Sequence, residues 1–308
     1  MHLISELPKI YFFEMRLRES TEQGYRVATN ALIRFAGDCL IDEIDRKTIL
    51  TWRKSILGRQ VKEVSWNTYV RHLRALFGYA IKNNLTSHLE NPFDGCGVRC
   101  PNRPPKTVKR LLIRDARILL VGMARSEMRT CAMCSFHPAW FWRTVFETFF
   151  YTGIRAKELI NLRPRDVDLG SMTICIHPEV SKNFDEHRVP IHSKLAKHLR
   201  ILLLNAQKRG VTANDQLFNV NKFSQRHGRQ TMDMNQLSRF YTALSRRLGT
   251  HVSPHRFRHT IATDLMRQPK CNLHIVKDLL GHRSISTTLK YVHVDVDQVR
   301  CALEEMRL

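Results

Sequence analysis

The stretch Ser253-Pro254-His255-Arg256-Phe257-Arg258-His259 decides how this chain folds around its functional residues. A proline directly after a serine is typical of the first turn of a helix. His255, Arg258 and His259 stand at positions i, i+3 and i+4, so a helix places all three on one face. A guanidinium beside two imidazoles favours a site that binds an anion and moves a proton.

Three other segments complement this set. Arg155 lies in Thr152-Gly153-Ile154-Arg155-Ala156-Lys157-Glu158-Leu159, where a helix can begin after a turn and direct backbone amides at an anion. Leu280-Gly281-His282 ends one predicted helix, and Tyr291 follows nine positions after the histidine. Lys182 lies in the turn of a predicted hairpin. Together these groups can clamp a phosphate, activate a phenol and protonate a leaving alcohol without a metal.

The residue types fit substitution at a phosphodiester. Its nonbridging oxygens gain negative charge during the reaction, and guanidinium forks donate paired hydrogen bonds to that geometry. A tyrosine nucleophile is a good leaving group in reverse, which conserves bond energy without ATP. Its free pKa is about 10, so it needs a positive field and a base. Tyr151 and Tyr241 are rival phenols, but only Tyr291 follows a Gly-His turn.

Charge indicates a polyanionic partner. The 308 residues are enough for two domains with separate cores, and the formal net charge is +22 with a pI near 10.1. Residues 1–100 carry 15 Lys and Arg against 11 acidic residues, which leaves 35 against 17 in residues 101–308. Basic groups on phosphates release counterions. A merely soluble basic protein is the alternative, and a membrane surface is disfavoured because no basic amphipathic segment stands apart.

The eight cysteines form no tight framework, and neither a signal peptide nor a membrane-spanning apolar run is expected. This pattern favours reduced thiols in a cytoplasm. Cys131, Cys134 and His137 have the spacing of half a metal site, but no second half follows. Ordinary packing is therefore expected there and at Cys96 and Cys100, and no metal site is predicted.

Residues 1–90 are expected to form a helical domain. Three helix starts are predicted, at Ser20 or Thr21, at Asp45 and at Ser65. The third helix is the clearest, because its apolar residues recur at helical spacing and share one face. These apolar residues are Tyr69, Leu73, Leu76, Phe77 and Ala80. Its polar face carries Asn67, Arg71 and Arg74, which suits either a solvated surface or a bound polyanion.

A linker and a second domain follow. Residues 91–110 are rich in proline and glycine, which cannot continue a helix, and they also carry several basic side chains. Alternation over 172–176 and 187–191 predicts a small hairpin. Helices are predicted over 111–123, 140–151, 195–208, 235–248, 255–266, 273–280 and 286–293. The expected fold is mainly α with a small antiparallel β-sheet, in two domains, and segments 124–139 and 210–234 have no predicted role.

The order and spacing of these motifs resemble the tyrosine recombinase, or phage integrase, family. The match runs motif by motif over roughly the last 150 residues and more loosely over the first 100. Residues 68–77, with Asn91-Pro92, resemble the core-binding helical domain of that family. The resemblance implies a Xer-like, two-domain protein without an arm-binding domain. Its parts would be a core-binding, SAM-like domain (1–90), a basic linker (91–110) and a catalytic domain (111–308).

The resemblance assigns roles to the site residues. The implied catalytic residues are Arg155, Lys182, His255, Arg258, His282 and Tyr291, with Tyr291 as the nucleophile. Arg155 and Arg258 would clamp the phosphate, and Lys182 would protonate the departing 5′ oxygen. Without that context, Lys182 would be an ordinary exposed hairpin lysine. Glu158 would orient basic groups or form a plain surface ion pair, and His259 would give structural support. Lys157 departs from the small residue expected before Glu158.

The resemblance also implies the partners. Double-stranded DNA would be the substrate, contacted by Arg71, Arg74, Arg103 and Lys106, with the linker along the DNA backbone or simply solvated. The protein would act as a homotetramer on two sites, without a metal or nucleotide cofactor. The amphipathic tail with Val299, Cys301, Leu303 and Met306 would dock on a neighbouring protomer or on its own domain. The expected location is the bacterial nucleoid.

Two other functions fit part of the pattern. A type IB topoisomerase-like enzyme shares the chemistry but would relax supercoils instead of recombining paired sites. A DNA-binding regulator would keep the fold and lack the reaction, although every expected catalytic member has a candidate. The DNA sequence recognised, the choice among integration, excision and multimer resolution, and any accessory factor do not follow from the sequence.

Overall fold

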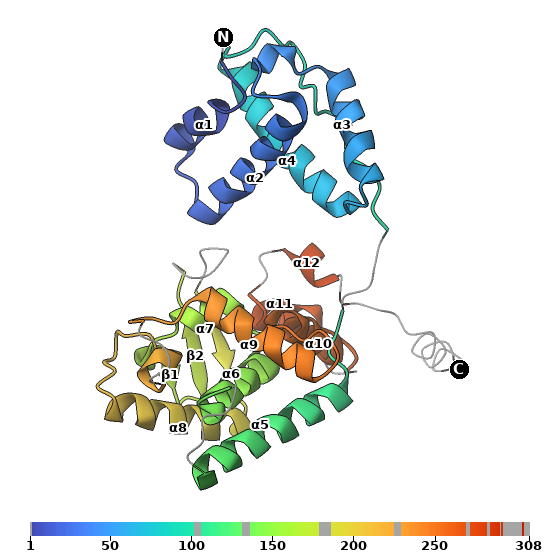
Figure 1. Ribbon diagram of the computed structural model, residues 1–308. Coiled ribbons are helices and arrows are strands. Elements are labelled where there is room, and N and C mark those ends of the chain that lie inside the picture. The colour runs from blue at the N-terminus through green and yellow to red at the C-terminus, as the bar shows by residue number, and fades with distance from the viewer. Residues whose placement is uncertain are drawn as a thin grey trace. The chain divides into compact units, whose positions relative to one another are not determined.

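The structure is a computed structural model, and it comprises two compact units, Met1–Arg103 and Pro104–Leu308 (Figure 1). It describes residues 2–101, 106–130, 136–178, 186–224, 229–268, 272–281, 284–289, 291 and 304. Each unit has its own hydrophobic core, as expected for chains of this length.

The first unit is helical. Its elements are α1 (Leu7–Met15), α2 (Glu19–Ala36), the 3-10 helix η1 (Ile41–Glu43), α3 (Arg46–Gly58) and α4 (Glu63–Lys82). Helix α4 packs against α1, α2 and α3, so it is the central element of this unit. The face of α4 predicted to be apolar is buried, and Trp66 and Phe77 are completely inaccessible to solvent. The helical core predicted for the N-terminal residues is therefore present.

Two of the predicted helix starts have different outcomes. Asp45 caps α3 as predicted, because its Oδ1 accepts a hydrogen bond from the Thr48 amide at 2.7 Å. Ser65 is not a cap, since α4 already begins at Glu63 and its N-cap position is Lys62. Helix α1 was not predicted, because it is short and its apolar residues do not follow a clear helical period.

The start of the predicted linker belongs to the first unit. Phe93 and Cys96 are fully buried in its core. The Trp66 indole donates to the Cys96 carbonyl at 2.9 Å, and Asn67 donates to the Val98 carbonyl at 2.8 Å. The expectation that the whole stretch 91–110 is a linker is thus wrong for residues 91–98. Helix α4 already ends at Lys82, and residues 91–98 form a packed loop against its unit.

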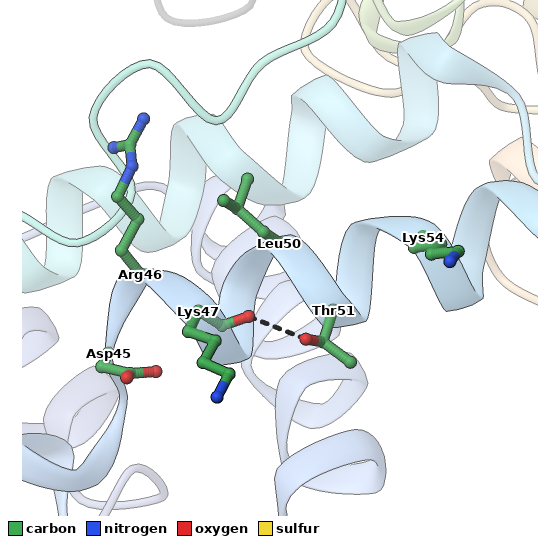
Figure 2. A pocket seen from close by; sticks show the side chains of 6 residues that line it. All are labelled: Asp45, Arg46, Lys47, Leu50, Thr51 and Lys54. Carbon is green, nitrogen blue, oxygen red and sulfur yellow. Dashed lines mark hydrogen bonds between the residues drawn. The ribbon is translucent and has the colours of Figure 1, made fainter.

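A basic pocket lies along α3 (Figure 2). It is lined by Asp45, Arg46, Lys47, Leu50, Thr51 and Lys54. The Thr51 hydroxyl donates to the Lys47 carbonyl at 2.9 Å, so its polar group is satisfied within the helix. The three cationic side chains share one stretch of the helix, which no sequence motif marks.

The second unit is mainly helical around a small sheet. Its helices are α5 (Arg110–Thr130), α6 (Ala139–Thr152), α7 (Ala156–Asn161), α8 (Ser193–Lys208), α9 (Met234–Arg247), α10 (Pro254–Met266), α11 (Leu273–Leu279) and α12 (Ile285–Leu289). Two 3-10 helices, η2 (Pro164–Asp166) and η3 (Val220–Lys222), lie between them. Helix α6 packs against α5, α8 and α10, and its aromatic residues fill the core.

The sheet has three antiparallel strands in the order β1-β2-β3. They are β1 (Val167–Asp168), β2 (Thr173–Ile176) and β3 (His187–Pro190). The predicted hairpin is β2 with β3, and its register pairs Ile174 with Val189. Strand β1 was missed because two residues are too few to show alternation. Ile174, Ile176 and Val189 point into the core, so the opposite face of the hairpin carries the polar residues.

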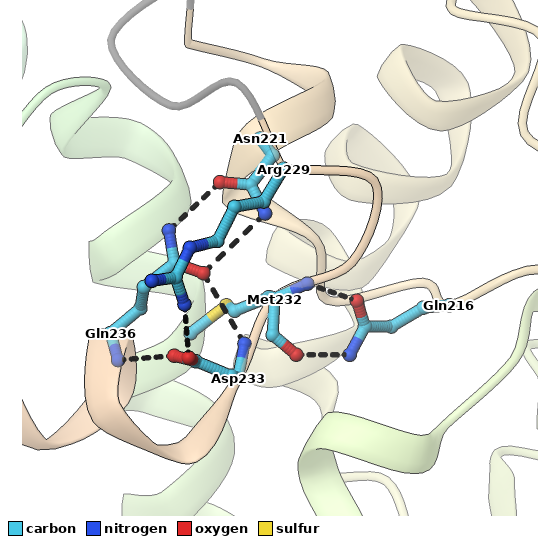
Figure 3. A network of polar contacts seen from close by, with 6 residues as sticks. All are labelled: Gln216, Asn221, Arg229, Met232, Asp233 and Gln236. Carbon is cyan, nitrogen blue, oxygen red and sulfur yellow. Dashed lines mark hydrogen bonds and ion pairs between the residues drawn. The ribbon is translucent and has the colours of Figure 1, made fainter.

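A polar network organises segment 210–234, for which the sequence predicted no role (Figure 3). The Gln216 amide donates to the Met232 carbonyl at 2.9 Å and accepts from the Met232 amide at 2.7 Å. Gln236 donates to Asn221 at 2.8 Å. Asp233 caps α9 by accepting from the Gln236 amide at 2.8 Å. The described parts of the segment, 210–224 and 229–234, are thus tied together and position the start of α9.

The overall fold class is confirmed: the described residues are mainly helical with one small antiparallel sheet. In the other segment without a predicted role, 124–139, α5 continues to Thr130 and α6 begins at Ala139. The Glu127 carboxylate there accepts from the Ala139 amide at 2.8 Å and contacts His137 Nδ1 at 3.0 Å. His137 therefore has an internal carboxylate partner, while Cys131 and Cys134 lie outside the described residues.

Gly153 ends α6 with a left-handed backbone, φ +63°, at a close contact with α10. A Cβ there would lie 2.8 Å from Ile261 Cγ2 and 3.3 Å from Leu280 Cδ2. We expect Gly153→Ala to lower the free energy of unfolding by about 1–3 kcal/mol, because the backbone conformation and the contact are both unfavourable for alanine. The loss is measured by following hydrogen exchange of the α10 amides at a series of urea concentrations.

Gly122→Ala is the matched control. Gly122 lies within α5, and a Cβ there would have no neighbour within 4 Å. This substitution should raise stability by up to about 1 kcal/mol through helix propensity. Equal effects of the two substitutions would show that the Gly153 turn is not under the constraint described.

Candidate active site

The structure brings four of the six predicted catalytic residues to one region of the second unit. Arg155 is the N-cap residue of α7, and His255 and Arg258 lie on the first turns of α10. Tyr291 follows α12 and is buried against Ala262, among others, in a small apolar cluster. Lys182 and His282 lie outside the described residues, as does Arg103.

Arg155 is fixed by Glu158. The Arg155 amide donates to Glu158 Oε2 at 2.7 Å, and Arg155 Nη1 donates to Glu158 Oε1 at 2.5 Å. Glu158 is only 1% exposed, so the pair is not the surface ion pair that the sequence left open. A buried carboxylate holding both the backbone and the side chain sets the direction of the guanidinium.

Arg258 is the buried cation of the site. It is 4% exposed, and its Nη1 donates to the Gly153 carbonyl at 2.9 Å while Nη2 donates to the Leu280 carbonyl. Burial, and then the charge of Arg155, lower the pKa of Arg258 to about 10. Arg258 therefore remains charged near neutral pH, at a cost in free energy that a bound anion would reduce.

The two guanidinium groups meet at one turn. Arg155 Nη2 donates to the Gly281 carbonyl at 3.2 Å, next to the Leu280 carbonyl that accepts from Arg258. Glu158 compensates only part of this paired positive charge. Two oriented guanidinium groups with uncompensated positive charge suit a phosphate, because its oxygens accept paired hydrogen bonds from their N–H groups.

The imidazoles form a short chain toward Tyr291. The rings of His255 and His259 lie 4.1 Å apart, and those of His259 and Tyr291 lie 5.3 Å apart. Partial burial and the charge of Arg258 lower the pKa of His255, so this solvent-exposed imidazole favours its neutral, proton-accepting form. Burial, His255 and Arg258 lower the pKa of His259 to about 4. His259 is thus a neutral packing partner for the phenol.

Tyr291 is 5% exposed. Burial raises the pKa of its hydroxyl, and the charges of Arg258 and Arg155 partly oppose that effect. The phenol is therefore protonated in the free protein. The electrostatic coupling nevertheless shows that both guanidinium groups act on the same hydroxyl.

The hairpin reaches the site through a contact that the sequence did not reveal. A Cβ on Gly281, which has φ +56°, would lie 2.9 Å from Cε1 of the His187 ring on β3. Glycine is required for this approach, so the Leu280-Gly281 turn contacts the loop end of the β2–β3 hairpin. Only the folded chain places residue 187 beside residue 281, about 94 positions away.

The predicted polyanion-binding residues are exposed where the structure describes them. Arg71, Arg74 and Lys106 are exposed, and Arg74 pairs with Asp94. The basic residues along α3 were missed, because a helix with Arg46, Lys47 and Lys54 has an ordinary solvated pattern in sequence. Charge alone does not distinguish such a face from any other helix surface.

Residues 128–298 match the phage integrase family, which is more than half of the chain. A protein of Pseudomonas aeruginosa named as a XerC tyrosine recombinase is 41% identical over 305 residues, covering 98% of this chain and 71% of that protein. The chain belongs to the phage integrase family. The recombinase class of DNA strand-exchange enzyme predicted from its motifs is thereby confirmed.

Other relatives extend the comparison. A XerC homologue of Pseudomonas syringae is 41% identical over 302 residues, and this chain spans 98% of its own length but 64% of the relative's. Among solved structures, a Tn1549 transposon integrase in complex with circular intermediate DNA aligns with a TM-score of 0.75 at 17% identity, covering 99% of this chain and 100% of that one. XerH bound to its difH substrate aligns at 0.70 and 19%, covering 99% and 84%. These structures share the fold of this phage integrase family member.

Among the described residues, no helix combines the length and the apolarity needed to cross a bilayer.

His259 makes the second unit sensitive to acid. Its folded pKa of about 4 lies below the ordinary value of 6.5, so the unfolded chain binds more protons between these pH values. The stability contributed by the neutral ring is complete above pH 6.5 and is lost as pH falls toward 4. We expect wild-type protein to lose about 1 kcal/mol more than His259→Gln over that range, a value discounted for partial exposure.

Thermal unfolding of both proteins at a series of pH values measures the difference. His251→Gln is the control, because that exposed histidine is not part of the ring chain. Parallel pH profiles for wild type and His259→Gln would contradict the assignment of His259 as a buried neutral imidazole.

Proposed function

We propose that this recombinase cuts and rejoins duplex DNA through a 3′-phosphotyrosyl intermediate formed by Tyr291. The observation that supports this most is the pair Arg155 and Arg258, which converge on the Leu280-Gly281 turn and act on the buried Tyr291 hydroxyl. A reaction that places added negative charge beside a phenol is the chemistry that two such cations favour.

The proposed step replaces one bond to phosphorus with another. The Tyr291 oxygen attacks the phosphorus and the bond from phosphorus to the 5′ oxygen breaks. His255 accepts the phenol proton, and its lowered pKa keeps it neutral and ready to do so. Lys182 protonates the departing 5′ oxygen. Attack by a 5′ hydroxyl of a second strand reverses these steps and joins the strands.

The other members hold the phosphate. Arg155 and Arg258 bind the nonbridging oxygens, and Glu158 orients the Arg155 guanidinium through a hydrogen bond. His282, which lies outside the described residues, would add a further hydrogen-bond donor. His259 supports the phenol through ring contact. These roles need no metal or nucleotide, because the chain supplies the charge, the base and the acid.

Double-stranded DNA is the proposed partner. Most of the excess positive charge lies in residues 101–308, and the first unit adds exposed Arg71 and Arg74 and the cationic face of α3. Arg103 and Lys106 would contact the DNA backbone. Related structures favour this choice, since the Tn1549 integrase and XerH, and a lambda integrase dimer on a core site, were each solved with DNA.

The proposed domain roles follow from this partner. The first unit would bind the core of the recombination site, and the second would carry the chemistry. A homotetramer on two sites would exchange strands, with the C-terminal tail docked on a neighbouring protomer. The reaction would serve integration, excision or resolution of DNA, including mobile elements, at the bacterial nucleoid in the cytoplasm.

Tyr291→Phe tests the nucleophile. On a nicked suicide substrate, where the cleaved strand diffuses away, wild-type protein should accumulate a covalent protein–DNA adduct in the presence of EDTA. Tyr291→Phe should retain DNA binding and form no adduct, because only the attacking oxygen is removed. The measurement is denaturing electrophoresis of labelled DNA, with a mobility-shift assay for binding.

Tyr151→Phe and Tyr241→Phe are the controls for the rival phenols. Tyr241 is buried, and its hydroxyl has no hydrogen-bond partner among the described residues, so its removal should leave the adduct intact. Adduct formation by Tyr291→Phe would reject the assignment. Relaxation of supercoils without recombination of paired sites would favour the topoisomerase alternative.

Arg258→Lys tests the clamp. One lysine nitrogen cannot bond both the Gly153 and Leu280 carbonyls while also meeting a phosphate, and burial lowers the pKa of an amine. We expect adduct formation to slow by about 100-fold or more. Arg256→Lys, at the partly exposed neighbour that donates to the His251 carbonyl, should change the rate by less than about threefold. Similar rates for both variants would show that the fork of Arg258 is not needed.

A further inference from the structure

A group of metal-ligating side chains lies at the loop end of the β2–β3 hairpin, outside the catalytic set. A cysteine sulfur, a histidine nitrogen and a carboxylate oxygen there all lie within 4.8 Å of one another. They belong to Cys175 on β2, His177 just after it, and Glu186 just before β3. The register pairs Ile176 with His187, so residue 177 comes opposite residue 186.

The three side chains share the outer face of the hairpin. Ile174 and Ile176 point into the core, so Cys175 and His177, two positions apart, lie on the opposite face. Cys175 and His177 are half-buried and Glu186 is exposed. A cation could therefore reach them from solvent without any movement of the core.

His177 is already oriented by a buried carboxylate. Its Nε2 lies 2.9 Å from Asp166 Oδ1, and Asp166 on η2 is 4% exposed. With Nε2 donating its proton to Asp166, Nδ1 keeps the lone pair that a metal needs. Metal-bound histidines generally donate their other ring nitrogen to a carboxylate, which fixes the tautomer and increases basicity. The fold therefore supplies the second partner of a histidine ligand as well as the ligands.

We propose that Cys175, His177 and Glu186 bind one divalent cation of the Zn²⁺ type, with a water molecule as fourth ligand. Sulfur, imidazole nitrogen and carboxylate oxygen together match the ligands of Zn²⁺, whereas Mg²⁺ and Ca²⁺ prefer oxygen alone.

A cation bound here would replace the proton of the Cys175 thiol. Burial, then Glu186 and Asp166, raise the pKa of the Cys175 thiol, and Arg188 opposes them. The free thiol is therefore protonated. On binding, the thiol releases its proton to solvent, and thiolate and carboxylate balance the two positive charges of the metal. Arg165, 3.8 Å from Asp166, is the other cation near this group.

The bound cation would join the two strands at the end from which residues 179–185, including Lys182, continue. Beyond Glu186, the His187 ring contacts Gly281, whose carbonyl accepts from Arg155. The cation is not on the reaction path. It would hold the loop end of the hairpin in place relative to the Leu280-Gly281 turn.

Cobalt substitution tests the site. Co²⁺ bound by a thiolate and an imidazole gives a charge-transfer band and visible d–d bands that free Co²⁺ lacks. The full-length protein carrying Cys131→Ser and Cys134→Ser should bind one equivalent of Co²⁺, and Zn²⁺ should displace it. This background removes the other cysteine pair that has metal-like spacing. Hydrogen exchange of residues 175–178 and 186–188 should slow when Zn²⁺ is added.

Cys175→Ser in that background should abolish the charge-transfer band, and Glu186→Gln or Asp166→Asn should weaken binding about tenfold or more. Cys39→Ser is the matched control, a half-buried cysteine in the first unit, and should bind as the background does. Circular dichroism verifies that each variant is folded. Absence of the bands in the folded background protein, or their persistence in Cys175→Ser, would overturn the proposal.

Discussion

The burial of Arg258 is the constraint on which the second unit depends. A guanidinium with 4% exposure must have its donors satisfied, and here the carbonyls of Gly153 and Leu280 satisfy two of them. These carbonyls end α6 and α11, so one side chain of α10 joins the neighbouring helix α11 to α6, which is about 100 residues earlier in the chain. Gly153 has to be glycine because α10 passes too close for a Cβ. The site is thus built from helix ends, where backbone groups are left unpaired.

Arg155 and the hairpin complete the arrangement around the same turn. The buried Glu158 fixes Arg155, and Arg155 bonds to Gly281, against which the His187 ring packs. Burial, and then the charge of Arg155, lower the pKa of Arg258. This electrostatic strain is relieved when a negatively charged group binds. Under the proposed function, a bound phosphate would recover part of the free energy that folding spends on these charges.

Much of the fold could be predicted from local patterns, and the failures have identifiable causes. The helices α2, α3, α6 and α8 to α11 and the hairpin of β2 and β3 were predicted from local patterns, although neither Ser20 nor Thr21 caps α2, which begins at Glu19 with Arg18 at its N-cap position. Helix α1 and strand β1 are too short for a period to show. Ser65 looked like a cap, but α4 begins two residues earlier at Glu63, with Lys62 at its N-cap position. Residues 91–98 had the composition of a linker, and only burial of Phe93 and Cys96 shows that they pack.

The sequence by itself determined which chemistry this chain carries. Residue types and spacings, such as His255 with Arg258 and Tyr291 after a Gly-His turn, depend on local helix geometry and can be recognised in one dimension. The tertiary structure alone decided how these groups act. It buried Glu158, lowered the pKa of His259 to about 4, and placed Asp166 behind His177. Burial and electrostatic coupling arise between segments that are distant along the chain, so no local pattern contains them.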